Sequence, residues 1–236
     1  MTSTSSADRN ETQQQFQTAV KRAMYFIPLY LLVPAAFWLI FHYSGTEMEW
    51  KAFGLGALGW TIALFLRGPL SAIVMKMPKD KAAKIIIGSS GVFEESIRVA
   101  LLLLTSMSYS WALSIGQGWA AVEVLFTVIN LIVMASLAKR TDDKSMQAKE
   151  MLKLQGNLNK SPLWGVIERV FASAFHIGCT LIVAKHPWTV AILIPLHSFL
   201  NLATFKFSKT SIVKTEILLA IIGTITFVAG ILLFHY

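Results

Sequence analysis

The chain has 236 residues, of which 55% are hydrophobic and only 14% are charged, a balance that excludes an ordinary soluble globular domain. The formal charge of +8 could suggest nucleic acid, but no stretch mixes basic and aromatic residues as a binding platform would, so no nucleic-acid partner is expected. The single cysteine, Cys179, lies in an apolar segment, which rules out an intramolecular disulfide and argues against a thiolate metal site.

The N-terminal segment, residues 1–23, is polar and low in hydrophobicity, and we expect it to be either disordered or a surface helix. The apolar run that follows, at about 24–43, is longer than a typical signal-peptide core and is not followed by a small-residue cleavage site. We therefore interpret it as an uncleaved first membrane span.

Further apolar runs along the chain are also long enough to cross a bilayer, which takes roughly 20 residues of helix. Their continuous apolar character does not fit the alternating pattern of a transmembrane barrel. The sequence therefore predicts an all-α, polytopic transmembrane helical bundle, with residues 24–236 as one transmembrane domain in the lipid bilayer. The seven predicted spans are 24–43, 51–75, 87–108, 111–138, 162–184, 187–206 and 213–235.

Basic residues gather at one end of these spans. The N-terminal tail and the second, fourth and sixth connections carry most of the Lys and Arg, whereas the other three connections contribute only Lys51 and Lys185. By the positive-inside rule, the N-terminus is predicted to be cytoplasmic and the C-terminus external, in the cell membrane. Two basic connections, 77–84 and 139–162, are polar enough to lie on the membrane surface, and the longer one has room for a short amphipathic helix.

Several ionisable or strongly polar residues fall inside the predicted spans, where each costs a few kcal/mol or more and is a functional candidate by default. Because a helix rises about 1.5 Å per residue, the depth of each side chain follows from its distance to the span end. One set shares the inner to middle part of the bilayer, and a second set lies shallower, at the rim. The first set is Glu94, Glu95, Arg98, Glu123, His176, His197 and Asn201, and the rim set is Glu168 and Arg169.

Helical spacing indicates which of these side chains share a face. Glu94 and Arg98 are four residues apart, with the acid on the N-terminal side as a favourable pair requires, and Glu95 is about 100° away from Glu94. We therefore expect Arg98 to pair with one acid, most directly with Glu94, and the other acid to remain free. His197 and Asn201 are also four residues apart and present adjacent polar groups on one face.

Imidazole, carboxylate and amide oxygen together form a reasonable zinc-binding set, and catalytic zinc typically keeps three protein ligands and one open position for water. A free carboxylate nearby could act as general base towards that water. The pattern thus favours metal-dependent hydrolysis inside the membrane. For each residue alone a plainer interpretation stays open, because a buried His or Asn often hydrogen-bonds between helices and a Glu–Arg pair can be structural.

Other functional classes fit these residues less directly. The His-Glu-x-x-His motif of soluble zinc proteases is absent, and every Asp lies outside the predicted spans, which excludes intramembrane aspartyl proteolysis. Residues 88–91, Gly-Ser-Ser-Gly, are similar to the short serine motif of rhomboid proteases, but Ser90 lies near the start of its span beside acids rather than a histidine. Outside the hydrolases, a proton- or cation-coupled transporter could use the same buried network, and an inactive membrane scaffold could retain it.

Four motifs occur in order along the chain: GVFEESIR at 91–98, GQGWAAVE at 116–123, ERVFASAFH at 168–176 and LHSFLN at 196–201. This series most resembles the YhfC-type intramembrane metalloproteases of bacteria, within the Abi/CAAX protease and PrsW-like superfamily. The resemblance covers about residues 88–205. The second motif has Trp119-x-x-x-Glu123 where CAAX prenyl proteases have Phe-x-x-x-His, as in the PrsW-like branch, which argues against prenylated substrates.

The resemblance implies roles for the matching positions without supplying a coordination list. Glu94 or Glu95 would activate the hydrolytic water, and Arg98 would be a partner of these acids or a substrate-orienting cation. The groups implied for the metal or the transition state are Glu123, His176, His197 and Asn201. We therefore expect a metal-dependent endopeptidase with a divalent metal, zinc by its ligand set, in a catalytic core at about 87–206. Its substrate would be a membrane-associated peptide or protein, cleaved in the cytoplasmic half of the bilayer.

Overall fold

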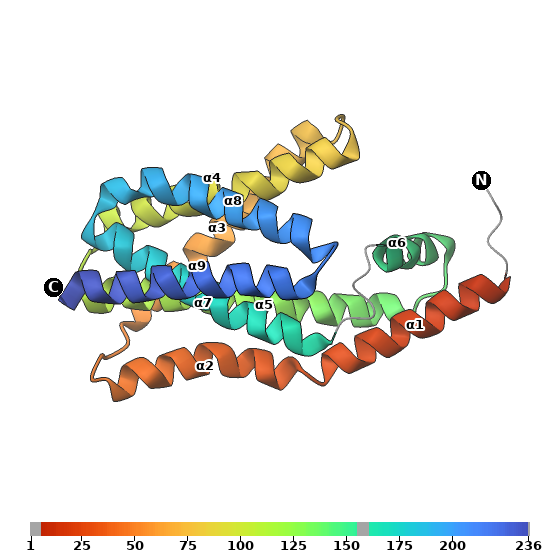
Figure 1. Cartoon of the computed structure of the whole chain (residues 1–236), viewed down its shortest axis with the longest axis horizontal. Coiled ribbons are helices and arrows are strands. Elements are labelled where there is room, and N and C mark those ends of the chain that lie inside the picture. The colour runs from red at the N-terminus through yellow and green to blue at the C-terminus, as the bar shows by residue number, and fades with distance from the viewer. Residues whose placement is uncertain (1–5, 155–160, 236) are drawn as a thin grey trace.

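The computed structural model describes residues 6–154 and 161–235, and within these ranges every regular element is a helix. The predicted all-α class is therefore confirmed. The helices in chain order are α1 (Ser6–Met24), α2 (Ile27–Tyr43), α3 (Trp50–Val74), α4 (Lys79–Leu104), α5 (Tyr109–Lys139), α6 (Asp143–Leu154), α7 (Pro162–Lys185), a short 3₁₀ turn η1 (Pro187–Thr189), α8 (Val190–Ser208) and α9 (Ile212–His235). Figure 1 shows the longer helices running side by side as a bundle.

Six helical segments in the described ranges are long and apolar enough to cross a membrane, and they correspond to six of the seven predicted spans. The remaining predicted span is α4, which is 26 residues long but carries Glu94, Glu95 and Arg98 in its apolar part. Because α4 packs against α3 and α8, these three charged side chains are buried inside the bundle rather than exposed to lipid. The polytopic bundle is thus confirmed, although α4 is too polar to be recognised as a span by hydropathy alone.

The polar connections are more helical than the sequence indicated. The predicted surface stretch 77–84 contributes the first turns of α4, which begins at Lys79. In the longer connection the short amphipathic helix is present as α6, while 155–160 lie outside the described residues. Asp142 begins α6 by accepting hydrogen bonds from the Ser145 hydroxyl at 2.7 Å and its backbone N–H at 3.1 Å. These bonds, with Arg140 nearby, lower the pKa of the Asp142 carboxyl from 3.8 to about 2.

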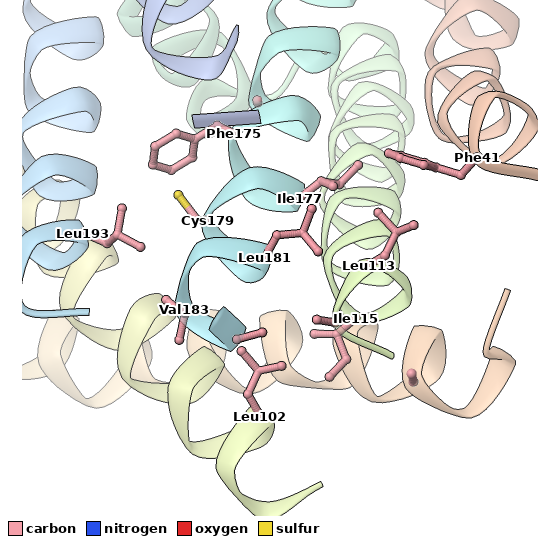
Figure 2. Close-up of a cluster of buried hydrophobic side chains, with 14 of the residues drawn as sticks. Phe41, Leu102, Leu113, Ile115, Phe175, Ile177, Cys179, Leu181, Val183 and Leu193 are labelled. Atoms are coloured by element: carbon pink, nitrogen blue, oxygen red, sulfur yellow. The ribbon is translucent and has the colours of Figure 1, made fainter. Parts of the chain in front are cut away.

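The core of the bundle is built around α7. In the most apolar stretch of α7, 67% of the residues are buried, whereas the share is 17% to 22% in the other five candidate spans. Small residues allow its neighbours to approach closely: a Cβ added at Gly178 would lie 2.4 Å from the backbone of Thr226 on α9. Figure 2 shows the apolar side chains that α7 places between its neighbours, including Phe175, Cys179 and Leu181. Cys179 is fully buried among them, away from any surface.

Helices α1 and α6 lie together at one end of the bundle, and the C-terminus lies at the opposite end (Figure 1). The Gln13 side chain donates to the backbone carbonyl of Ala138 at 2.8 Å, which fixes α1 to the end of α5. The buried ammonium of Lys149 on α6 donates to the Gln13 side chain and to the Arg140 carbonyl. The polar N-terminal segment is therefore a helix that packs on the bundle, and the disordered alternative does not apply from residue 6 onward.

Candidate metal centre

The α4 helix supplies three charged side chains that are almost completely buried, namely Glu94, Glu95 and Arg98. Arg98 pairs with Glu95, three residues earlier, through Nε to Oε2 at 2.9 Å and Nη2 to Oε1 at 3.3 Å. The expected pair between Glu94 and Arg98 is not formed, so that part of the prediction was wrong. Separations of three residues (Glu95) and four residues (Glu94) both place an acid on the same face of α4 as Arg98. Contacts from other helices therefore decide which acid pairs with Arg98.

Glu94, the other acid, is not free as the spacing had suggested. Its Oε1 is paired with the guanidinium of Arg67 on α3, and its Oε2 accepts a hydrogen bond from the indole of Trp119 on α5 at 3.3 Å. Arg67 is a site residue that the sequence analysis missed. Arg67 could have been found in the same way as the other residues, because it is an ionisable side chain inside the predicted span 51–75.

His197 on α8 lies against both acids. Its Nδ1 is 2.8 Å from Oε1 of Glu95, and its Nε2 is 3.9 Å from Oε2 of Glu94. A carboxylate only accepts hydrogen bonds, so Nδ1 carries a proton and donates it to Glu95; in the neutral imidazole the lone pair is then on Nε2, the nitrogen nearer to Glu94. A carboxylate that fixes the tautomer and orientation of a histidine in this way is the usual support of a metal-binding imidazole.

His176 on α7 has both ring nitrogens engaged. Its Nδ1 is 3.0 Å from Arg98 Nη2, and because a guanidinium can only donate, Nδ1 is the acceptor. The proton is then on Nε2, which lies 2.8 Å from Oε2 of Glu123 and donates to it. Arg98 also donates to the His176 carbonyl at 2.9 Å and to the hydroxyl of Thr180, so it fixes this turn of α7 as well as Glu95.

The two rim residues extend this network towards the surface. Arg169 donates to Oε1 of Glu123 at 2.7 Å and also pairs with Glu168, the more exposed of its two carboxylate partners. Glu123 therefore lies between a histidine and an arginine. A continuous chain of hydrogen bonds and ion pairs runs from Glu168 to His176.

Asn201 lies one turn along α8 from His197 and donates to the hydroxyl of Ser90 on α4. It lines the same cavity as the acids and histidines, but its amide nitrogen is turned towards Ser90. Ser90, the residue of the rhomboid-like motif, is buried and donates to the Ile87 carbonyl. No histidine contact of Ser90 occurs among the described residues, so the serine-protease interpretation gains no support.

Glu94, His176 and His197 bring three ligand-type atoms within 4.8 Å of one another, and all three residues are buried. No other group of three or more His, Cys, Asp or Glu side chains with this spacing occurs in ranges 6–154 and 161–235. One carboxylate and two imidazoles suit zinc, which binds three protein ligands in catalytic sites. The residues present therefore fit a divalent ion, with Glu95 already supporting His197.

Two cavities meet at this cluster. The smaller, of about 120 Å³, is lined by Glu94, Glu123, His176 and His197. The larger, of about 700 Å³, has mostly apolar walls formed in part by α1, α5 and α7. Both cavities are bordered by four of the same residues, namely Arg67, Glu168, Asn201 and Thr204. The cavity at the polar cluster thus adjoins, across these side chains, a space large enough for a peptide segment.

The chain matches the sequence model of the YhfC intramembrane metalloprotease family over residues 29–223. The chain belongs to the YhfC family. The matched region includes every residue of the buried cluster described above. The YhfC description supports a membrane metalloprotease that uses a divalent metal and gives no support to the transporter alternative. A comparison with curated proteins and one with solved structures found no match.

One further ionisable residue escaped the sequence analysis. Glu216 on α9 is buried, and neither of its carboxylate oxygens has a hydrogen-bond partner among the described residues. It lies inside the predicted span 213–235 but close to its start, where an acid is easily attributed to the membrane interface. Glu216 lines neither cavity, and we assign it no part in the cluster.

Proposed function

We propose that this protein is a zinc-dependent endopeptidase that cleaves membrane-associated peptides or proteins at the Glu94, His176 and His197 cluster. The observation that carries the proposal is the convergence of these three buried donors beside a cavity, with Glu95 holding His197 in a metal-binding tautomer. A divalent ion at this position supplies Lewis-acid polarisation of a peptide carbonyl and activation of water. The surrounding residues orient the ligands and exclude bulk water.

The two histidines are not equally prepared to bind an ion. His197 offers the lone pair of Nε2 without any change in its hydrogen bonds. A neutral imidazole that binds through Nε2 carries its proton on Nδ1, and in His176 that proton would oppose Arg98 Nη2. His176 therefore joins the ligand set only when Arg98 Nη2 turns away from it, and we expect metal binding to depend more on His197 than on His176.

Metal analysis tests the proposal directly. Purified protein should hold about one zinc or similar divalent ion per chain. The His197→Ala variant should lose it, whereas His42→Ala, an exposed histidine stacked on Trp38 in α2, should keep it. Metal content equal to that of a protein-free detergent control would refute the metalloprotease proposal.

Glu94 fits two roles, as a ligand or as the base that activates water, and one substitution separates them. Glu94→Gln keeps the shape of the side chain and removes its charge. A variant that retains metal but no longer cleaves assigns Glu94 as the base, and loss of both assigns it to the coordination sphere. Comparing the membrane proteomes of cells that contain active protein or the Glu94→Gln variant would identify accumulating substrates.

We also propose that the end of the bundle that carries α1 and α6 faces the cytoplasm, as the distribution of Lys and Arg indicates. The only native cysteine, Cys179, is fully buried and should not react with a membrane-impermeant maleimide, so single cysteines can be introduced. Glu47→Cys, between α2 and α3, should be labelled on intact cells. Lys144→Cys, on α6, should be labelled only after permeabilisation, and the reverse pattern would invert the proposed orientation.

A further inference from the structure

Arg67 is placed between the polar cluster and the larger cavity. It projects from α3, its guanidinium pairs with Glu94 through Nη2, and 23% of its side chain is exposed. It borders both the 120 Å³ and the 700 Å³ cavity. Of the residues that border both cavities, Arg67 is the one whose side chain pairs with Glu94.

The hydrogen-bonding capacity of Arg67 is only partly used. Its Nε is buried, and among residues 6–154 and 161–235 no acceptor reaches it. A buried donor without an acceptor is costly, so this side of Arg67 is held in place by its pair with Glu94 rather than by its own hydrogen bonds. The Nε–H lies on the same edge of the guanidinium as the Nη2 that pairs with Glu94, whereas Nη1 is not buried and makes no hydrogen bond among the described residues. Arg67 therefore has its Nε/Nη2 edge on the side of Glu94 and its Nη1 left for another partner.

The larger cavity indicates the kind of partner. Its walls include the apolar side chains of Ile87, Leu131, Met134 and Phe205, and its 700 Å³ matches the size of pockets that hold small organic ligands or peptide side chains. A peptide lying there can place apolar side chains against these walls. Its backbone carbonyls still need hydrogen-bond donors when they leave water.

We propose that Arg67 is a substrate-binding residue that donates from Nη1 to a backbone carbonyl of a peptide whose apolar side chains occupy the 700 Å³ cavity. This inference rests on the proposed peptidase function and adds to it the side from which the substrate enters and the residue that sets its register. Arg67 thereby links substrate position to Glu94, because one guanidinium contacts both. An apolar peptide segment is the substrate class that this arrangement selects.

Two hydroxamate probes test the inference without knowledge of the natural substrate. Acetohydroxamate reaches only the metal, whereas acetyl-Leu-Leu-hydroxamate adds peptide carbonyls and apolar side chains. Affinities of both probes are measured by calorimetry on the zinc-loaded, detergent-purified full chain. Arg67→Lys keeps the positive charge beside Glu94 but lacks Nη1, so it should weaken the peptide hydroxamate roughly tenfold more than it weakens acetohydroxamate. Equal affinity of wild type and Arg67→Lys for the peptide probe would overturn the proposal.

Further variants exclude a purely structural effect. Arg140→Lys, a matched change at an exposed arginine beside Asp142, should leave both affinities unchanged. Met134→Trp fills part of the large cavity and should weaken only the peptide probe, and unchanged binding would show that the peptide does not lie there. Wild-type protein that binds neither probe and holds no zinc contradicts the proposed function itself. Wild type that binds both probes, with Arg67→Lys unaffected, contradicts only the role of Arg67.

Discussion

Replacing Glu95 by Gln should weaken zinc binding although Glu95 itself is not expected to touch the metal. The carboxylate accepts the Nδ1 proton of His197 at 2.8 Å, and its loss removes the negative charge that raises the basicity of that imidazole. Changes to such supporting groups usually lower metal affinity by about 10- to 100-fold, and because the Gln oxygen can still accept the same hydrogen bond, we expect the lower end of that range.

The same substitution also affects stability, because Glu95 and Arg98 are both completely buried. Removing one partner of a buried pair leaves the other charge uncompensated and typically costs about 3 to 5 kcal/mol. The double variant Glu95→Gln/Arg98→Met removes both charges and should recover part of that loss. Because Arg98 also opposes metal binding by His176, the double variant is compared with Arg98→Met alone, and its zinc affinity should be lower because His197 still lacks its carboxylate.

Zinc affinity is measured by competition with a chromophoric chelator in detergent, and stability by thermal unfolding of the same samples. A folded Glu95→Gln protein with wild-type zinc affinity would refute the reasoning that Glu95 prepares His197. Equal zinc affinity of the double variant and of Arg98→Met would also contradict it, since the loss of Glu95 would then leave metal binding unchanged.

Two further predictions concern the scaffold. Gly56→Ala on α3 should destabilise the protein by about 1 to 3 kcal/mol, because the new Cβ would lie 2.1 Å from the backbone oxygen of Ile115, whereas Gly54→Ala, with nothing within 4 Å, should not. Equal thermal stability of the two variants would contradict this account of the α3–α5 contact. Because the pKa of Asp142 is lowered from 3.8 to about 2, its stabilisation of the start of α6 should be complete above about pH 4 and be lost as the pH falls towards 2. Carbon-13 NMR titration of the Asp142 carboxyl should show a midpoint near 2, and a midpoint near 3.8 would show that the bonds to Ser145 do not form in solution.

Most of the fold follows from the sequence because membrane helices are defined by long apolar runs, which a sequence displays directly. The central position of α7 does not follow in the same way. Its small residues permit close approach, but small residues also occur in α3, and only the packing shows which helix is surrounded. The start of α4 was also predicted wrongly. Its first turns are polar, and a polar stretch between two apolar runs has the composition of a connection.

The candidate site was predictable as a set of residues and much less so as a set of contacts. Depth and the cost of burying charge selected Glu94, Glu95, Arg98 and the two histidines, but spacing within α4 could not decide which acid meets Arg98. That choice depends on Arg67 and His197, which approach from α3 and α8. A one-dimensional pattern contains no information on which helix lies on which side, so partners on other helices must be seen in three dimensions.

The charged residues of α4 also constrain how the protein is made. Glu94, Glu95 and Arg98 each cost a few kcal/mol in lipid, so α4 gains little by entering the bilayer alone. Its acids obtain their partners from α3, which is synthesised earlier, and from α8, which is synthesised about a hundred residues later. Stable insertion of α4 therefore depends on helices from both halves of the chain, and the residues proposed for catalysis also link α4 to the helices that must be present before it is stable.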